Sequence, residues 1–264
     1  MSLNIITQPL LNLLIIFYHL LFSDLGLAII GFTAFIRLLL TPLTLPSMKM
    51  MQKMKEYNPE LNRIKEKHKD DKKKLLQAQT DFYKEKGINP ASGCLPQIVS
   101  IVILIALFSG FSEVFQGSDI THQLNKVLYP ALQISGEVNR FFLGRDLTKP
   151  DVFNLAGIPF ALPGVFLIVV AFLQFLSSKM MMPNVQAAEK VAKKTEGGAD
   201  DFATSMQSQM MYMYPLITLF IGLKFPLGVV LYWGTFSLFQ AVQQYFVSGW
   251  GGLAPWVSKI RKAS

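Results

Sequence analysis

The sequence predicts an all-α membrane protein, with five transmembrane helices, an N-terminal amphipathic helix in the membrane interface and a cytoplasmic helical hairpin. The prediction rests on two features of the 264-residue chain, which is 51% hydrophobic and has a positive mean hydropathy. First, the apolar residues are grouped in long blocks, and a block of about 18 or more residues can cross the roughly 30 Å hydrocarbon core of a bilayer. Second, the charged residues, 16% of the chain, lie almost entirely between these blocks.

The blocks divide the chain into a series of expected segments. They are an N-terminal interfacial helix (1–23), a first span (24–46), a cytoplasmic hairpin (47–90), a second span (91–112), an extracytoplasmic loop (113–157), a third span (158–180), a cytoplasmic loop (181–205), a fourth span (206–225), a fifth span (226–247) and a basic cytoplasmic tail (248–264). The fourth apolar block is short for a span, so its helix is expected to begin before the block does. A tight turn at 224–226 makes the last two spans a hairpin.

Residues 3–22 have two possible interpretations. They are apolar enough to span, yet Gln8, Asn12 and His19 interrupt them, and the segment contains no Lys or Arg. If the segment spanned, the N-terminus would lie in the cytoplasm without a positive flank, which the positive-inside rule disfavours. We therefore expect an amphipathic helix lying in the outer interface, with a sixth span as the alternative. A cleavable signal is not expected, because the start has no basic region and no small-residue cleavage site follows the first block.

The distribution of Lys and Arg predicts the orientation. Residues 47–86 hold twelve of them, whereas in residues 113–157 Asp and Glu outnumber the basic residues. With five spans, the first and third loops and the basic tail share one side, so the N-terminus faces out and the C-terminus faces the cytoplasm. The net charge of +8 is then explained by topology without sequence-specific nucleic-acid binding, although a ribosome could use the same face. The lone Cys94 excludes an intrachain disulfide and a Cys-based metal site, and no metal site is predicted.

The first loop is expected to form two paired helices. Pro59 begins the first one after Asn58, a polar turn follows at 69–71, and the second helix ends at Gly87. The apolar stripe of this helical hairpin is thin. It is enough to pair the two helices but not to build a core.

Arg37 is the single charged residue within the apolar block of the first expected span. It lies nine residues before Pro46, the expected cytoplasmic end of the first span, which is roughly 13 Å at 1.5 Å per residue. A charge at mid-membrane costs from about 3 to more than 10 kcal/mol, and such residues almost always face a bundle interior or a watery cavity. The alternative is an arginine that snorkels to the surface or is held by backbone carbonyls. Thr33, four residues earlier, lies on the same helical face.

The apolar centres of the expected spans contain no Asp, Glu or His, and no glycine-rich phosphate loop is present. A proton-coupled transporter or an intramembrane hydrolase would need such groups, so neither an enzyme nor a cofactor is predicted. This favours an arginine that receives a negative charge from a partner. Further polar residues on the spans are Ser100, Gln174, Tyr232, Trp233, Thr235, Ser237, Gln240, Gln243 and Gln244. Any one of them is explained by helix packing alone, but together with Arg37 they suggest a hydrophilic groove.

Three stretches resemble the YidC insertase family, the bacterial relatives of the mitochondrial Oxa and chloroplast Alb proteins. The first core span of that family, with its arginine, is similar to GLAIIGFTAFIRLLLTPLTLPSMKMMQKM. Its cytoplasmic hairpin and the start of its second span are similar to YNPELNRIKEKHKDDKKKLLQAQTDFYKEKGINPASGCLP, the most specific of the three. Its last span is similar to FPLGVVLYWGTFSLFQAVQQYF.

The resemblance implies a five-helix insertase, without a large external domain, in the bacterial plasma membrane, where it promotes entry of membrane proteins without nucleotide hydrolysis. By position, the groove arginine of the family is Arg37, the groove threonine is Thr33, the third-span glutamine is Gln174, and the aromatic pair is Tyr232 and Trp233. The sequence departs from the family in the second span, where a typical Gln-x-Pro stretch is Ser100–Ile101–Val102.

The partners that the resemblance implies are nascent membrane proteins and the lipid bilayer, with the ribosome and the Sec translocon as further candidates. The alternative function is a transporter of small anions or lipid headgroups that uses Arg37 as its binding site.

Overall fold

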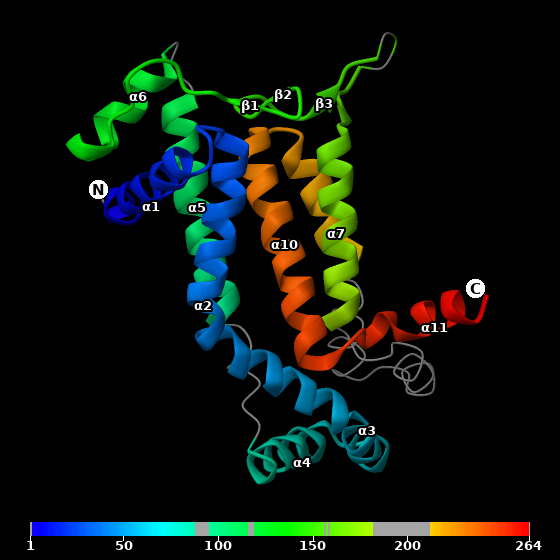
Figure 1. Cartoon of the computed structure of the whole chain (residues 1–264). Coiled ribbons are helices and arrows are strands. Elements are labelled where there is room, and N and C mark those ends of the chain that lie inside the picture. The colour runs from blue at the N-terminus through cyan, green and yellow to red at the C-terminus, as the bar shows by residue number, and fades with distance from the viewer. Residues whose placement is uncertain are drawn as a thin grey trace. The chain divides into compact units, whose positions relative to one another are not determined.

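A computed structural model describes residues 2–87, 95–115, 119–155, 157, 159–181 and 212–263 (Figure 1). Its helices are α1 (Ser2–Leu20), α2 (Leu25–Glu56), α3 (Asn58–Lys67), α4 (Lys72–Glu85), α5 (Leu95–Phe115), α6 (Ile120–Val127), α7 (Val165–Met181), an unlabelled helix Tyr212–Gly222, α10 (Leu227–Ser248) and α11 (Ala254–Ala263). Short 3-10 turns are η2 (Pro130–Leu132) and η3 (Gly251–Leu253). Cys94, most of the expected 181–205 loop and the start of the expected fourth span lie outside the described residues. The part that is described is mostly helical, in agreement with the predicted fold class.

The chain forms two compact units. The first unit contains α1, α6 and the strands, together with α2 up to Leu40, α5 from Ile98, α7 up to Gln174, the helix Tyr212–Gly222 from Leu216 and α10 up to Phe239. The second unit contains the remaining parts of these divided helices, together with α3, α4 and α11.

In the first unit, α1 packs through an apolar stripe. Leu11, Leu14, Ile15 and Tyr18 are all buried and recur at the spacing of one helical face. Polar contacts also fix its position. The Asn12 side chain accepts from the N–H of residue 129 at 2.7 Å, and the Tyr18 hydroxyl accepts from the N–H of residue 139 at 3.0 Å. The 119–139 segment is therefore fastened to α1 by hydrogen bonds as well as by apolar contact.

Helix α2 is longer than the first span was expected to be. The sequence predicted an end at residue 46, but the helix continues through Pro42 and Pro46 to Glu56. Soluble helices usually end before a proline, whereas spanning helices tolerate one where neighbouring groups satisfy the freed backbone. By length and composition, Leu25–Met50 is the single clear membrane span among the described residues. The shorter apolar helices are Ile5–Leu20, Ile101–Ser112, Val165–Met181 and Tyr212–Gly222.

In the second unit, α3 and α4 pack against each other. The rings of Tyr57 and Phe82 meet edge to face, with centroids 5.9 Å apart, and Lys86 pairs with Glu60 at 3.4 Å. The carboxylate of Asp71 accepts hydrogen bonds from the first backbone N–H groups of α4. Apart from Leu61, Leu75 and Phe82, few side chains of the pair are buried.

Two short antiparallel sheets lie in the 139–164 connection. Their strands are β1 (Phe141–Phe142) with β2 (Arg145–Asp146), and β3 (Val152–Phe153) with β4 (Leu162–Pro163). Leu143 and Gly144, both at positive φ, form the two-residue turn between β1 and β2.

The same connection closes the ends of two long helices. The first N–H groups of α10, from Leu227 and Gly228, donate to the carbonyls of Lys149 and Leu147 at 2.8 Å each. The buried carboxylate of Asp151 accepts from the N–H of Leu167 in the first turn of α7 at 3.1 Å. These contacts satisfy backbone donors that a helix start leaves without partners.

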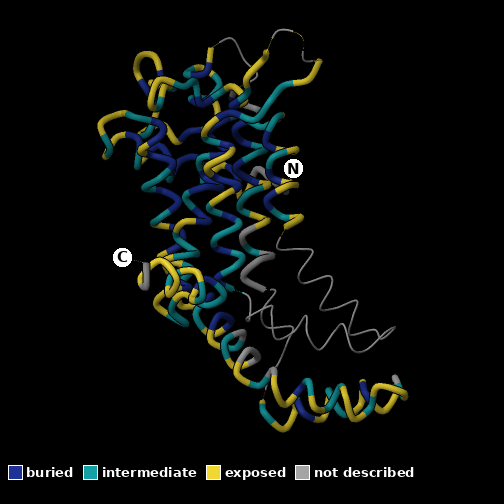
Figure 2. The backbone as a smooth tube through the Cα atoms, turned by 90° about the vertical axis from the view of Figure 1, so that its right-hand side faces the viewer, coloured by how far each residue is buried: buried dark blue, intermediate teal, exposed yellow. Residues whose placement is uncertain are grey.

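Large apolar side chains are exposed along the long helices. Examples are Phe35 and Leu38 on α2, Phe172 on α7, Phe220 in Tyr212–Gly222 and Phe246 on α10. Buried and exposed stretches alternate along these helices (Figure 2). On a soluble protein, so much exposed apolar surface would mark an interaction site. On a membrane protein, it is the surface expected to contact lipid.

Candidate functional site

Arg37 is buried in the first unit. Its side chain is only 5% exposed, and Thr33, one turn earlier on α2, is 0% exposed. The Thr33 hydroxyl donates to the carbonyl of Ile29 at 2.6 Å, which is the usual contact of a threonine within its own helix. The structure thus places both predicted residues on the inward face of α2.

The guanidinium of Arg37 packs against aromatic rings of α10. Its Cζ atom lies 4.1 Å from the ring centroid of Phe236 and 5.7 Å from that of Phe239. The negative face of an aromatic ring attracts a cation at this range, so the two phenylalanines stabilise the buried charge.

Sequence reasoning missed these two rings. The signal that could have found them is periodicity, because Tyr232, Phe236 and Phe239 recur at intervals of four and three residues on one face of a helix.

Tyr232 belongs to the same cluster. It is 3% exposed, and its ring centroid lies 6.2 Å from that of Phe236. Trp233 is the next residue of α10 and is 8% exposed, and its carbonyl accepts from the Ser237 hydroxyl at 2.9 Å.

Gln174 forms a second polar contact in the first unit. It is 1% exposed, and its side-chain carbonyl accepts a hydrogen bond from the hydroxyl of Thr218, which is 0% exposed. The amide nitrogen of Gln174 is buried and has no hydrogen-bond partner among the described residues. A spare buried donor of this kind can bind a polar atom that a ligand or a water molecule brings. Sequence reasoning missed Thr218, whose small hydroxyl gives no signal within an apolar block.

The polar residues at the end of α10 make their contacts in the second unit. Gln243 donates from its amide to the Thr41 hydroxyl at 2.8 Å, and Gln240 contacts the sulfur of Met181. The side-chain carbonyl of Gln243 is buried and has no hydrogen-bond partner in the described part of the chain. Ser100 lies on α5, but its side chain falls outside the described residues. Within the described ranges, no three residues among His, Cys, Asp and Glu gather closely enough to hold a metal ion.

Comparisons with known proteins identify the family. The family model described as 60Kd inner membrane protein matches residues 16–251. Two relatives named Membrane protein insertase YidC, from Rickettsia rickettsii (strain Sheila Smith) and Rickettsia prowazekii (strain Madrid E), are 32% and 31% identical to this chain over 255 and 253 residues. Each match covers 92% of this chain and 39% of the relative, so the chain spans about two fifths of the length of these relatives. Because the family model matches most of its length, the chain belongs to the 60Kd inner membrane protein (YidC) family, which confirms the resemblance found in the sequence.

Proposed function

We propose that this chain is a membrane protein insertase that helps integral membrane proteins enter and fold in the bilayer through a hydrophilic groove containing Arg37. The observation on which the proposal rests is a 5% exposed arginine on the helix that is the clear membrane span. A buried charge on such a helix is costly and marks a functional site by default. The names of the relatives support the same assignment.

The proposed arrangement in the bacterial plasma membrane has five spans: α2, α5, α7, the helix Tyr212–Gly222 and α10. Exposed apolar side chains along these helices support contact with lipid. Helix α1 lies in the outer interface, where its buried stripe faces the protein and the exposed Ile16 and Leu20 face the acyl chains. The N-terminus is outside and the C-terminus is cytoplasmic.

The proposed mechanism is physical. A polar stretch of a nascent protein that enters hydrocarbon loses several kcal/mol for each polar group left without a partner. A groove that admits water and presents Thr33, Gln174 and Tyr232 lowers this cost. The substrate helix then moves sideways into lipid through its own hydrophobicity, so no nucleotide hydrolysis is required.

In the proposed mechanism, an acidic residue of the substrate competes with Phe236 for the guanidinium of Arg37. A cation–π contact stabilises by about 0.5–2 kcal/mol, whereas a hydrogen-bonded ion pair in the same apolar surroundings is stronger. An acidic residue near the exported end of a substrate can therefore displace the ring transiently. The ring then receives the guanidinium again once the acidic residue has crossed.

Reconstitution of the purified chain tests the proposal. The chain is placed in phospholipid vesicles and mixed with a purified single-span reporter, with no nucleotide present. We expect protease-protected reporter well above the level in empty vesicles. Reporter insertion no better than in empty vesicles, together with saturable flux of a small anion, would instead establish a transporter.

A further inference from the structure

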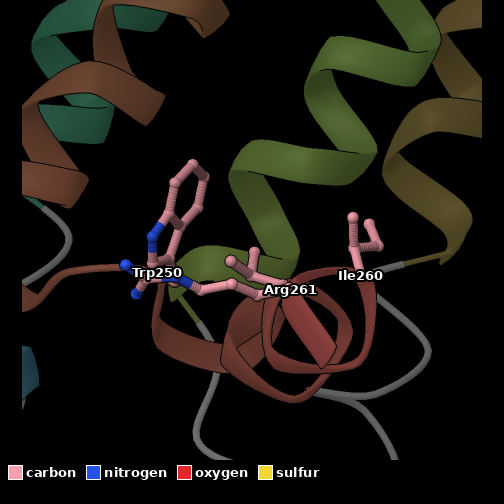
Figure 3. Close-up of a pocket in the computed structure, with 4 residues that line it drawn as sticks. Trp250, Ile260 and Arg261 are labelled. Atoms are coloured by element: carbon pink, nitrogen blue, oxygen red, sulfur yellow. The ribbon is translucent and has the colours of Figure 1, made fainter. Parts of the chain in front are cut away.

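A pocket lies where α10 turns into α11, in the second unit. Helix α10 ends at Ser248, and the turn that follows contains Gly249 and Gly251 at φ of 63° and 50°. The pocket has a volume of about 350 Å³ and is lined by Trp250, Val257, Ile260 and Arg261. Figure 3 shows the Arg261 side chain extending toward Trp250, so that one cation stands beside an otherwise apolar lining.

The lining has the chemistry of a lipid-binding surface. Ile260 is 71% exposed and Trp250 is 45% exposed, which is costly for large apolar side chains in water. Trp is the side chain that prefers the headgroup level of a bilayer, with one part apolar and one part wet. The guanidinium of Arg261 presents a planar set of donors that matches the oxygen atoms of a phosphate.

Contacts with the end of α7 hold this region in place. A side chain at Gly251 would collide with the backbone carbonyl of Met180, because its Cβ would lie 2.0 Å from that oxygen. The ammonium of Lys179 lies 3.1 Å from the ring centroid of Trp256, on the first turn of α11. Since α7 is a proposed span that ends at Met181, these contacts put α11 at the depth of the cytoplasmic headgroups.

We propose that this pocket binds an anionic phospholipid of the cytoplasmic leaflet. Arg261 holds the phosphate, while Trp250, Val257 and Ile260 contact the glycerol and the upper part of an acyl chain. Charge complementarity selects the lipid class, because the cytoplasmic leaflet is anionic and basic residues beside the membrane bind it. The inference rests on the proposed placement of the helices in the membrane, but not on insertion activity.

Lys259 provides a matched control. It is exposed, lies two residues from Arg261 on the same helix, and does not line the pocket. Residues two apart on a helix point to different faces. Lys259→Gln therefore removes the same charge from the same helix while leaving the pocket intact.

The experiment measures Trp fluorescence of the full chain in phosphatidylcholine vesicles. The vesicles contain a small fixed fraction of dibrominated phosphatidylglycerol or, in parallel, dibrominated phosphatidylcholine. The difference in quenching between the unsubstituted chain and Trp250→Phe is the quenching of Trp250 itself. We expect the brominated phosphatidylglycerol to quench Trp250 about five-fold more than the brominated phosphatidylcholine. This ratio corresponds to ~1 kcal/mol for one basic residue at an anionic surface.

Arg261→Gln should bring this ratio close to one, and Lys259→Gln should retain it, with circular dichroism showing that both variants are folded. Equal quenching by the two lipids in the unsubstituted chain would overturn the proposal without need of any variant. Equal losses in the two variants would also overturn it, since they would indicate diffuse charge attraction. The proposal would also be overturned if ribosome binding depended on Arg261 and quenching by the anionic lipid did not. Because insertion of a reporter is measured separately, failure of the insertase proposal leaves this ratio unchanged.

Discussion

The guanidinium of Arg37 lies over the ring of Phe236, with 4.1 Å between its Cζ atom and the ring centroid, and both side chains are buried. One member comes from the first half of α2 and the other from the first half of α10, so the contact joins the two helices within one compact unit. The ring face stabilises the buried guanidinium in that contact.

Removing the ring should weaken the fold through loss of the cation–π contact. We expect a coupling free energy of about 1–2 kcal/mol between Arg37→Met and Phe236→Leu in a double-mutant cycle. The measurement is the free energy of unfolding in mixed micelles. Phe239 serves as the control, because its ring lies 5.7 Å away and its coupling with Arg37 should be smaller. Equal coupling for both phenylalanines would show that the ring at 4.1 Å has no special role.

The hydrogen bond between Gln174 and Thr218 gives a second prediction. Thr218→Val leaves the side-chain carbonyl of Gln174 buried without this donor, and we expect a loss of about 1 kcal/mol in unfolding free energy. The double variant Gln174→Leu with Thr218→Val should recover part of that loss, because neither polar partner then remains. Thr235→Val is the control, since that hydroxyl donates to the carbonyl of Leu231 in its own helix. A loss for Thr235→Val as large as that for Thr218→Val would argue against a specific contribution from the contact between helices.

The stability of α4 should depend on pH through Asp71. The pKa of this carboxyl is lowered, chiefly because the backbone N–H of Lys74 donates a hydrogen bond to it. A lowered pKa in the folded state means that the stabilisation is complete above the unfolded pKa of about 3.9 and is lost as the pH falls through the folded value. We expect amide protection in α4, corrected for intrinsic exchange, to decrease below about pH 4.

Asp71→Asn is the control for this effect, because asparagine caps a helix about as well but does not titrate. Its protection in α4 should stay flat over the same range. A decrease as steep as in the unsubstituted chain would assign the pH dependence to other carboxylates.

The topology prediction can be tested by labelling. Cysteines are introduced at Ser2 and Ser264 in a background that lacks Cys94, and intact cells are treated with a membrane-impermeant thiol reagent. The cysteine at position 2 should react from outside, and the one at position 264 only after lysis. If position 2 also reacts only after lysis, residues 3–22 span the membrane and the number of spans is six.

Some features of the structure could be predicted from the sequence and others could not, for physical reasons. Arg37 stood out because one charge inside an apolar block has few explanations. Phe236, which contacts Arg37, did not stand out. Aromatic residues are common in spans, and a contact between residues far apart in the sequence produces no local sequence pattern. The continuation of α2 past Pro46 was missed because a proline normally ends a helix, and only the surroundings decide otherwise.

The 113–157 segment was predicted only as a loop, and the third span was predicted to begin at residue 158. That start was wrong, because β4 occupies Leu162–Pro163 and α7 begins at Val165. The strands of the 139–164 connection have two residues each, too few for an alternating pattern. The cap that Asp151 provides for α7 depends on a carboxylate sixteen residues from its partner, which no local motif encodes.

Insertion of a single-span reporter with or without acidic residues in its exported tail tests the proposed role of Arg37 most directly. Arg37→Ala should insert the acidic reporter at least about ten-fold less well than the unsubstituted chain, a factor equivalent to ~1.4 kcal/mol, and the neutral reporter nearly normally. Arg37→Lys should retain much of the activity if Arg37 acts as a point charge, whereas a bidentate role would make lysine fail too. The melting temperature of each variant, measured in parallel, separates loss of function from loss of fold. Normal insertion of the acidic reporter by Arg37→Ala would contradict the electrostatic role of Arg37.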